Sequence, residues 1–334
     1  MKPKTSVPDL VKGVREGQRR SLAKAITLVE SQRDDHARAA QDMLQALHER
    51  SGNALRLGIS GTPGVGKSTF IEALGLRLVE AGHKIAILAV DPSSLRSGGS
   101  LLGDKTRMER LSRHPSAFIR PSPSGGYLGG TARRTREAML LCEAAGFDIV
   151  IVETVGVGQS EASVASMVDV FALLLHPGGG DELQGVKRGV LELCDLVCVH
   201  KADGDLRKSA QQTRLEYERG LHLLRPGERI PVMMASAITG EGLDRFWQQV
   251  QSEHHALQES GRLAHRRQDQ AESWLHRVIE DELNRRFFQH PGVANRKASV
   301  AESVRSGAEV PTRGALALLD AFFATLPAGN DQTQ

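Results

Sequence analysis

The segment Gly61–Ser68, with the sequence GTPGVGKS, constrains the fold of this chain more than any other feature. It fits the phosphate-binding loop pattern G-x-x-x-x-G-K-[ST], between an apolar, strand-like stretch at 55–60 and a helix-like stretch at 68–80. Glycines let backbone N–H groups close around phosphate oxygens, and the N-terminus of the following helix favours negative charge. The alternative is a chance match in a glycine-rich chain, and the flanking strand and helix argue against it. The sequence therefore predicts a protein that binds a nucleoside triphosphate.

The residues of this loop have separate expected roles. Lys67 is predicted to reach the β- and γ-phosphates, and the Ser68 hydroxyl is predicted to ligate magnesium. The loop and the first helical turn together supply the expected phosphate contacts, which are Gly61, Gly64, Val65, Gly66, Lys67, Ser68 and Thr69.

Composition limits the class of protein and its partners. The chain has 334 residues, of which 40% are hydrophobic and 25% charged, so we expect a soluble protein with one sizeable α/β core. The net charge of +3 is small, and its acids and bases are interleaved, so no nucleic-acid or membrane partner is predicted. The longest apolar runs are too short to span a bilayer, and no secretory signal follows the early lysines. Three cysteines in apolar surroundings are expected to be buried thiols rather than metal ligands, which favours a reducing cytoplasm.

Hydrophobic periodicity divides the chain into three predicted parts. Residues 1–53 are expected to form a helical extension, 54–257 a P-loop domain, and 258–334 a helical arm. Strands are predicted in the middle part at 55–60, 84–90, 117–120, 148–153, 168–175, 195–200 and 230–235. Helices are predicted between them near 67–81, 131–145, 160–167, 183–193, 206–224 and 242–257. This alternation predicts an α/β fold with a mostly parallel sheet covered on both faces. In the last part, helices at 266–289 and 312–325 are expected to be joined by a polar loop.

Acidic residues follow two of the predicted strands and lie in a third loop near the phosphate loop. Asp91 follows the strand at 84–90, Glu153 ends the strand at 148–153, and Asp104 lies in a glycine-rich loop. Open α/β sheets bind ligands at the carboxyl ends of their strands, and magnesium prefers oxygen ligands. We therefore expect these acids to ligate magnesium, directly or through water. Gly156 is placed to donate its N–H to a γ-phosphate.

The glycine-rich stretch 176–189 follows another predicted strand. It can be an ordinary strand-to-helix connection or a loop that senses the nucleotide, and its charges beside the predicted site leave both interpretations open.

Two later motifs predict which base is bound. Residues 200–203, with the sequence HKAD, resemble the guanine motif [NT]-K-x-D, in which the Asp carboxylate accepts from guanine N1–H and N2–H. The stem of Lys201 is expected to pack over the base, and Asp203 to select guanine. His200 departs from the usual Asn, whose side chain ties this loop to the phosphate loop. Ser236 and Ala237 match the Ser-Ala signature that meets guanine O6, so GTP is predicted over ATP.

Several longer motifs carry a family resemblance. They are DPSS from Asp91, GDKTRM from Gly103, ETVGVGQSE from Glu153, GDELQG from Gly180 and KADGD from Lys201. With these motifs the chain resembles the MeaB/ArgK family, GTPase chaperones of adenosylcobalamin-dependent acyl-CoA mutases such as methylmalonyl-CoA mutase. The similarity extends over nearly the whole chain, including the N-terminal helices and the Arg266-Arg267-Gln268 stretch.

The resemblance implies a GTPase core of the signal-recognition-particle and MinD-like class, with a helical N-terminal extension and a C-terminal dimerisation arm. It implies GTP/GDP and Mg²⁺ as cofactors, and a homodimer that gates cobalamin delivery to the mutase and protects or reactivates its cofactor. Its three switches correspond to residues 92–108, 154–161 and 177–189. Hydrolysis is expected to be slow alone and faster with the mutase, since no catalytic Gln stands at the usual place after Gly156, and Gln159 lies three residues beyond it. The residues that the resemblance implies for catalysis or its control are Lys67, Glu153, Asp104, Arg107 and Lys187, with Asp181 matching a position that responds to the partner.

Two other function classes stay open at this point. One is an ATP-using kinase of a basic-amino-acid transport system, against which Asp203, Ser236 and Ala237 argue. The other is a nickel-type metallochaperone GTPase, against which the missing Cys/His cluster argues.

Overall fold

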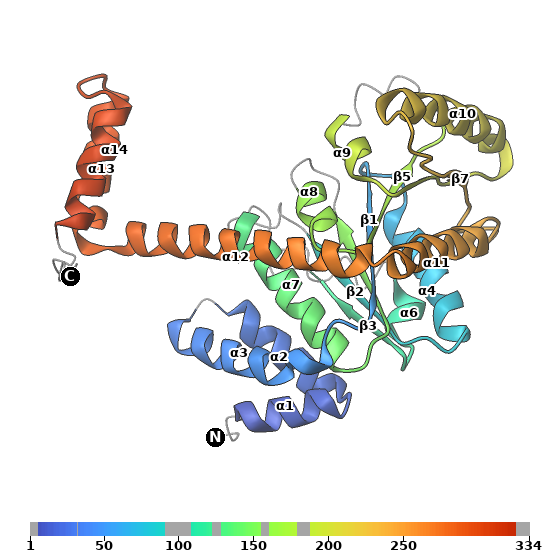
Figure 1. Ribbon diagram of the computed structural model, residues 1–334, viewed down its shortest axis with the longest axis horizontal. Coiled ribbons are helices and arrows are strands. Elements are labelled where there is room, and N and C mark those ends of the chain that lie inside the picture. Colours follow the sequence, from blue (N-terminus) through green and yellow to red (C-terminus); the bar gives the residue numbers. More distant parts are fainter. Residues whose placement is uncertain are drawn as a thin grey trace. The chain divides into compact units, whose positions relative to one another are not determined.

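The computed structural model describes residues 6–31, 33–90, 108–121, 128–154, 160–178 and 188–324. In this part of the chain a seven-stranded sheet has the order β3-β2-β4-β1-β5-β6-β7, and all neighbouring strands are parallel (Figure 1). The strands are β1 (Leu55–Gly61), β2 (Ile85–Val90), β3 (Ala117–Arg120), β4 (Ile149–Thr154), β5 (Val170–Leu175), β6 (Leu196–Val199) and β7 (Val232–Met234). The predicted α/β fold is confirmed, and the predicted strand ends agree to within about two residues.

Helices cover both faces of the sheet, which explains why β2, β4 and β5 are buried along their whole length. On one face, α4 (Lys67–Glu80), α6 (Glu109–Ser112) and α11 (Leu243–Glu259) share a buried apolar core with the strands. On the other, α8 (Ser160–Ala165) packs on β1, β4 and β5, beside α7 (Leu128–Ala144) (Figure 1). The close approach of α8 requires glycine at position 58, where a Cβ would lie 2.7 Å from Phe171 and 3.0 Å from Val164. At the β6–β7 edge of the sheet, α10 (Arg207–Leu224) packs on both strands and on η4 (Gly204–Leu206). The short α9 (Arg188–Leu193) contacts α8.

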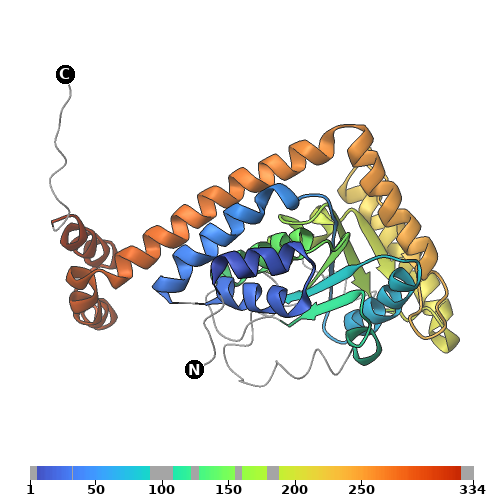
Figure 2. The same ribbon diagram turned by 90° about the horizontal axis from the view of Figure 1, so that it is seen from below.

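Residues before β1 form helices, as the sequence predicts. They are α1 (Val7–Arg15), α2 (Arg19–Glu30), α3 (Asp34–Leu47) and the short η1 (His48–Arg50). These helices pack on one another and on α7 (Figure 2). Their contact is apolar, through fully buried side chains such as Leu22, Ile26 and Met43. A carboxylate–guanidinium pair between Glu30 and Arg120 also joins α2 to the end of β3.

The C-terminal helices are α12 (Arg262–Gln289), α13 (Pro291–Arg305) and α14 (Pro311–Phe323). The chain forms two compact units, residues 1–270 and 271–334, so the start of α12 belongs to the first unit. In the second unit α13 packs on α14, with Val293 and Ala321 buried and the rings of Phe287 and Phe322 5.4 Å apart. The boundaries expected at 53/54 and 257/258 stay predictions.

The polar loop expected between the last two predicted helices is wrong, because helix α13 lies there. Proline breaks a helix in its interior, but Pro291 stands in the first turn, where its missing N–H costs nothing. The His290 side chain caps the same end by accepting from Gly292 N at 3.2 Å. Pro291 and Gly292, which on sequence alone indicate a loop, therefore form the first turn of this helix.

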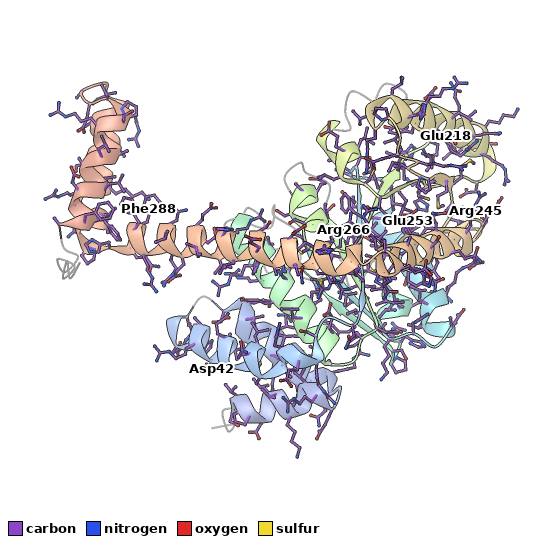
Figure 3. All side chains as sticks on the ribbon, in the orientation of Figure 1. Asp42, Glu218, Arg245, Glu253, Arg266 and Phe288 are labelled. Atoms are coloured by element: carbon purple, nitrogen blue, oxygen red, sulfur yellow. The ribbon has the colours of Figure 1, made fainter. Side chains whose placement is uncertain are left out.

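The first turns of α12 are fixed to the amino ends of the strands by a buried ionic cluster, which we call the Asp169 clamp. The Asp169 carboxylate is fully buried and accepts from the Arg267 guanidinium at 2.8 and 2.6 Å and from Arg56 N at 2.9 Å. Arg267 also donates to the carbonyls of Gly52 and Ala54. Arg266, labelled on α12 in Figure 3, pairs with Asp195 at 3.0 Å and completes the clamp. Both arginines come from the Arg266-Arg267-Gln268 stretch that the sequence singled out.

The described helices include no candidate for a membrane-spanning segment. None of these helices combines the length and apolarity needed to cross a bilayer.

Candidate functional site

The loop between β1 and α4 has the backbone that its glycines permit. Gly64 and Gly66 have φ values of 81° and 95°, in the left-handed region that other residues rarely adopt. A Cβ at position 64 would meet none of the described residues within 4 Å, so these residues leave that side of the loop free for a ligand. Gly66 precedes the first residue of α4, which places the N–H groups of the first helical turn beside the loop.

Lys67 holds a buried positive charge inside this loop. Its Nζ donates to Gly61 O at 2.7 Å and to Thr62 O at 3.2 Å, and the residue is 8% exposed. Burial lowers the pKa of Lys67, while the charges of Glu153 and Glu161 act to raise it. The arrangement supplies an ammonium group at the helix N-terminus, where phosphate charge is favoured.

Ser68 and Glu153 meet although 85 positions separate them in the sequence. Ser68 Oγ donates to Glu153 Oε1 at 3.1 Å, because β1 and β4 are neighbours and their carboxyl ends lie side by side. A hydroxyl and a carboxylate together are the oxygen donors that magnesium accepts, so this pair fits the expected metal. The structure thus brings together the two expected magnesium ligands that it describes.

Glu161 is a site residue that reasoning from the sequence missed. It lies in the first turn of α8, is 6% exposed, and is close enough to Lys67 for its charge to affect that residue's pKa. The available signal was its place at the end of the motif that starts at Glu153, in the first turn of a predicted helix. A second buried carboxylate therefore balances the lysine beside the phosphate loop.

The residues expected to recognise the base also come together. Ser236 Oγ donates to Asp203 Oδ2. Ser236 Oγ also accepts from the backbone N–H groups of Ile238 and Thr239, each at 3.2 Å. Residues 200–203, which we call the base loop, reach the phosphate loop directly, because Lys201 Nζ donates to Gly64 O at 2.8 Å. Ala237 follows Ser236 at the end of β7. These contacts leave the Asp203 carboxylate oriented by a hydroxyl, as a selective acceptor requires.

Several predicted residues lie outside the described residues. They are Asp91, Asp104, Arg107, Gly156, Gln159, Asp181 and Lys187, and their roles stay predictions.

The cysteines are buried and free. Burial raises the pKa of the Cys194 thiol to about 12, and it also raises the pKa of Cys142 and of Cys198. Among the described residues, no three His, Cys, Asp or Glu side chains are grouped so as to hold a metal ion.

Comparison with known proteins identifies the family. The sequence model of a family described as methylmalonyl Co-A mutase-associated GTPase MeaB matches residues 22–292, which include the phosphate loop and the base loop. The chain belongs to the MeaB family. The resemblance drawn from the motifs is thereby confirmed.

Relatives agree with this assignment along the whole chain. A Caulobacter vibrioides protein named putative GTPase is 53% identical over 326 residues, covering 97% of this chain and 99% of the relative. The methylmalonic aciduria type A homolog, mitochondrial, of Mus musculus is 47% identical over 329 residues, covering 95% and 79%. A crystal structure described as LAO/AO transport system kinase superposes with a TM-score of 0.75 at 38% identity, covering 97% of this chain and 100% of that one.

As a member of the MeaB family, the chain is a GTPase that converts GTP and water to GDP and phosphate. The loop of Lys67 and Ser68 is the part of the described structure that fits this activity.

Proposed function

We propose that this GTPase is a chaperone of an adenosylcobalamin-dependent acyl-CoA mutase, and that its GTP cycle gates the loading, protection or reactivation of the mutase cofactor. The observation that carries the proposal is the match of residues 22–292 to a family described as methylmalonyl-CoA mutase-associated. The name of the mouse relative, which refers to methylmalonic aciduria, supports the same partner class.

In this proposal GTP binds with its phosphates on Gly61–Thr69 and its base between Lys201, Asp203 and Ser236–Ala237. Lys67 holds the β- and γ-phosphates, and Ser68 and Glu153 hold Mg²⁺ together with Asp91 and Asp104. When bound, the metal ion supplies positive charge that offsets the phosphate charge in the transition state. Gly156 binds the γ-phosphate, and Arg107 and Lys187 act from the switch segments 92–108 and 177–189.

The hydrolytic rate is proposed to depend on the mutase. The experiment is to purify the chain from its host with its bound proteins, to identify the mutase among them, and to measure GTP turnover with and without it. We expect faster turnover with the mutase, because a cation that the partner supplies or positions would stabilise the transition state. The proposal would be contradicted if no mutase co-purified with the chain and if an added mutase left GTP turnover unchanged.

The preference of the chain for GTP or ATP distinguishes the proposed GTPase from the kinase alternative. A relative of known structure is described as a transport system kinase. The Ser236-oriented carboxylate of Asp203 favours guanine over adenine, since adenine has no matching donor pair. Tenfold tighter equilibrium binding of ATP than of GTP would favour the kinase.

For the nickel alternative, a titration that found a tight nickel site would favour a metallochaperone that carries its own metal.

We further propose that the chain forms a homodimer through its C-terminal unit. On α12, Leu275, Ile279 and Leu283 follow one another at intervals of one helical turn and are 58%, 46% and 59% exposed. Exposed Leu316 and Phe323 lie on α14 in the same unit. A second copy is the partner that the family resemblance implies for these apolar side chains, and a cytoplasmic location is proposed with it.

Changing both Leu275 and Leu283 to arginine is expected to convert the dimer to a monomer in sedimentation velocity. The reason is that the two charges would be desolvated at an apolar interface. The single change Glu272→Ala, on the same helix, is the control and should leave the dimer intact. A truncation that tests the same point should end after Gln270, because an earlier end removes Arg266 and Arg267 from the Asp169 clamp. A double variant that still sediments as a dimer would place the interface elsewhere.

A further inference from the structure

The residue before Lys201 is usually Asn in the guanine motif, and in this chain it is His200. His200 follows β6 directly and is 2% exposed, so its ring is part of the interior between the base loop and the phosphate loop. Its backbone N–H donates to Leu175 O at 2.8 Å and continues the pairing of β6 with β5. The departure from Asn is therefore accommodated inside the fold, at the junction of the two loops.

The imidazole contacts three separate elements. The edge carrying Cδ2 and Nε2 lies 3.1 Å from the place where a Cβ of Gly66 would stand, so the ring packs on the last glycine of the phosphate loop. The ring meets Phe70 of α4 edge-on, with centroids 5.2 Å apart. Nδ1 lies 3.4 Å from Ala235 O, beyond the end of β7. One side chain thus touches the phosphate loop, its helix and the strand that leads to Ser236.

The protonation of the ring follows from these contacts. Ala235 O can only accept, so Nδ1 carries the proton and donates to it. Burial lowers the pKa of His200 to about 4, and the hydrogen bond to Ala235 O opposes this only in part. At neutral pH the ring is therefore uncharged, and it adds no positive charge beneath the phosphate loop.

The base loop has a strained backbone that needs such support. Among the described residues, Lys201 is the only one other than glycine with a positive φ, at 58°. A left-handed conformation at a long side chain persists where its surroundings enforce it. Here Lys201 is held at one end by the buried His200 ring and at the other by the hydrogen bond from its Nζ to Gly64 O.

We propose that His200 is a positioning residue for guanine, and that its ring, wedged between Gly66, Phe70 and Ala235, fixes the loop of Lys201 and Asp203 relative to the phosphate loop. The ring takes the place of the Asn amide by packing and by one hydrogen bond. The inference rests on the guanine role proposed for Asp203. It adds that His200 determines the position of the Asp203 carboxylate.

The test is a double-mutant cycle with a ligand that lacks the base. GDP and inorganic tripolyphosphate are titrated calorimetrically into wild-type protein, His200→Ala, Asp203→Asn and the double variant. Asp203→Asn is expected to lower GDP affinity by about 10- to 100-fold, since a charged acceptor is lost. His200→Ala is expected to lower GDP affinity by about tenfold and to leave tripolyphosphate affinity unchanged. In the His200→Ala background, Asp203→Asn should cost no more than about threefold, because the carboxylate is already misplaced.

Two further variants separate positioning from folding. His200→Asn, which restores the usual amide, is expected to keep GDP affinity within about threefold of wild type. Val250→Ala, in the same apolar core but on α11, is the folding control and should keep its GDP affinity despite a lower melting temperature. If His200→Ala does not fold, His200→Leu preserves the buried volume without the flat ring or the donor, and the same selective loss is expected.

The outcomes distinguish the two proposals. An equal loss of GDP and tripolyphosphate affinity in His200→Ala, or an undiminished cost of Asp203→Asn in that background, would overturn the role of His200 alone. An unchanged GDP affinity in Asp203→Asn itself would overturn the guanine site on which that role rests.

Discussion

Replacing Lys67 with alanine is expected to lower GTP turnover by about 10²- to 10³-fold, the cost of removing one preorganised positive group from a phosphoryl-transfer site. The ammonium is already fixed inside the loop by Gly61 O and Thr62 O, so little reorganisation is needed for it to meet phosphate oxygens. It is also balanced by the buried carboxylates Glu153 and Glu161. Alanine removes the charge and leaves those carboxylates facing the phosphates.

Single-turnover hydrolysis and GDP titration measure the two parts of this effect. Loss of chemistry alone would leave GDP affinity unchanged, while loss of phosphate binding would lower both. Lys12→Ala, at an exposed position of α1, is the matched control and should turn over GTP at the wild-type rate. A Lys67→Ala protein that melts normally and retains more than about a tenth of wild-type turnover would exclude the role assigned to this residue.

The second large effect is expected on stability, from Asp169→Asn. Asp169 is fully buried and forms an ion pair with the guanidinium of Arg267, whose side chain is 18% exposed. Removing one partner of a buried ion pair leaves the other uncompensated, which typically costs about 3–5 kcal/mol. The amide also loses one acceptor for the N–H of Arg56 and for Arg267. Urea denaturation followed by circular dichroism at pH 7 measures the loss directly.

The pH dependence of this clamp has a defined sign. Burial acts to raise the pKa of Asp169, but His254, whose Nε2 lies 3.6 Å from the carboxylate, and the hydrogen-bonded Arg267 guanidinium outweigh it and lower the pKa to about 2. A carboxyl group with a lowered folded-state pKa stabilises the fold above its unfolded value of about 4, and the contribution fades as the pH falls towards 2. The difference between wild type and Asp169→Asn should therefore be full at pH 7 and shrink below pH 4.

An exposed pair provides the control for the clamp. Arg33 and Asp35 also form an ion pair, with side chains 67% and 57% exposed. Asp35→Asn should leave the urea midpoint where it is, because water screens both charges. Equal midpoints for wild type and Asp169→Asn at pH 7 would show that the clamp adds nothing to stability.

Local features of the sequence were sufficient to predict most secondary structure. Continuous apolar runs bounded by polar residues marked strands such as β2 and β5, since a strand buried on both faces has no polar side. The same reasoning failed at α13, where Pro291 begins a helix instead of ending one. A proline restricts only its own φ and the residue before it, so sequence alone does not decide between a break and a first turn.

For the candidate site, the residue types could be predicted from the sequence, but the order of the strands in the sheet decides which of these residues lie in contact. Lys67 and Ser68 are adjacent in one motif, so the sequence alone places them side by side. Ser68 meets Glu153 because β1 lies between β4 and β5 in the sheet, an order that hydrophobic patterns do not encode. Glu161 was missed for the same reason, because its burial beside Lys67 depends on where α8 packs.

The sequence by itself determined the chemistry of this protein: a phosphate loop, a guanine motif with His200 in place of Asn, and motifs of the MeaB family. These are short-range patterns, in which residue type and spacing carry the information. Only the tertiary structure decided how His200 replaces Asn, because its partners Gly66 and Ala235 are far from it in the chain. It also decided that Arg266 and Arg267 close a buried clamp on Asp169 and Asp195. Packing between distant segments sets burial, and burial sets what a charged or titratable side chain can do.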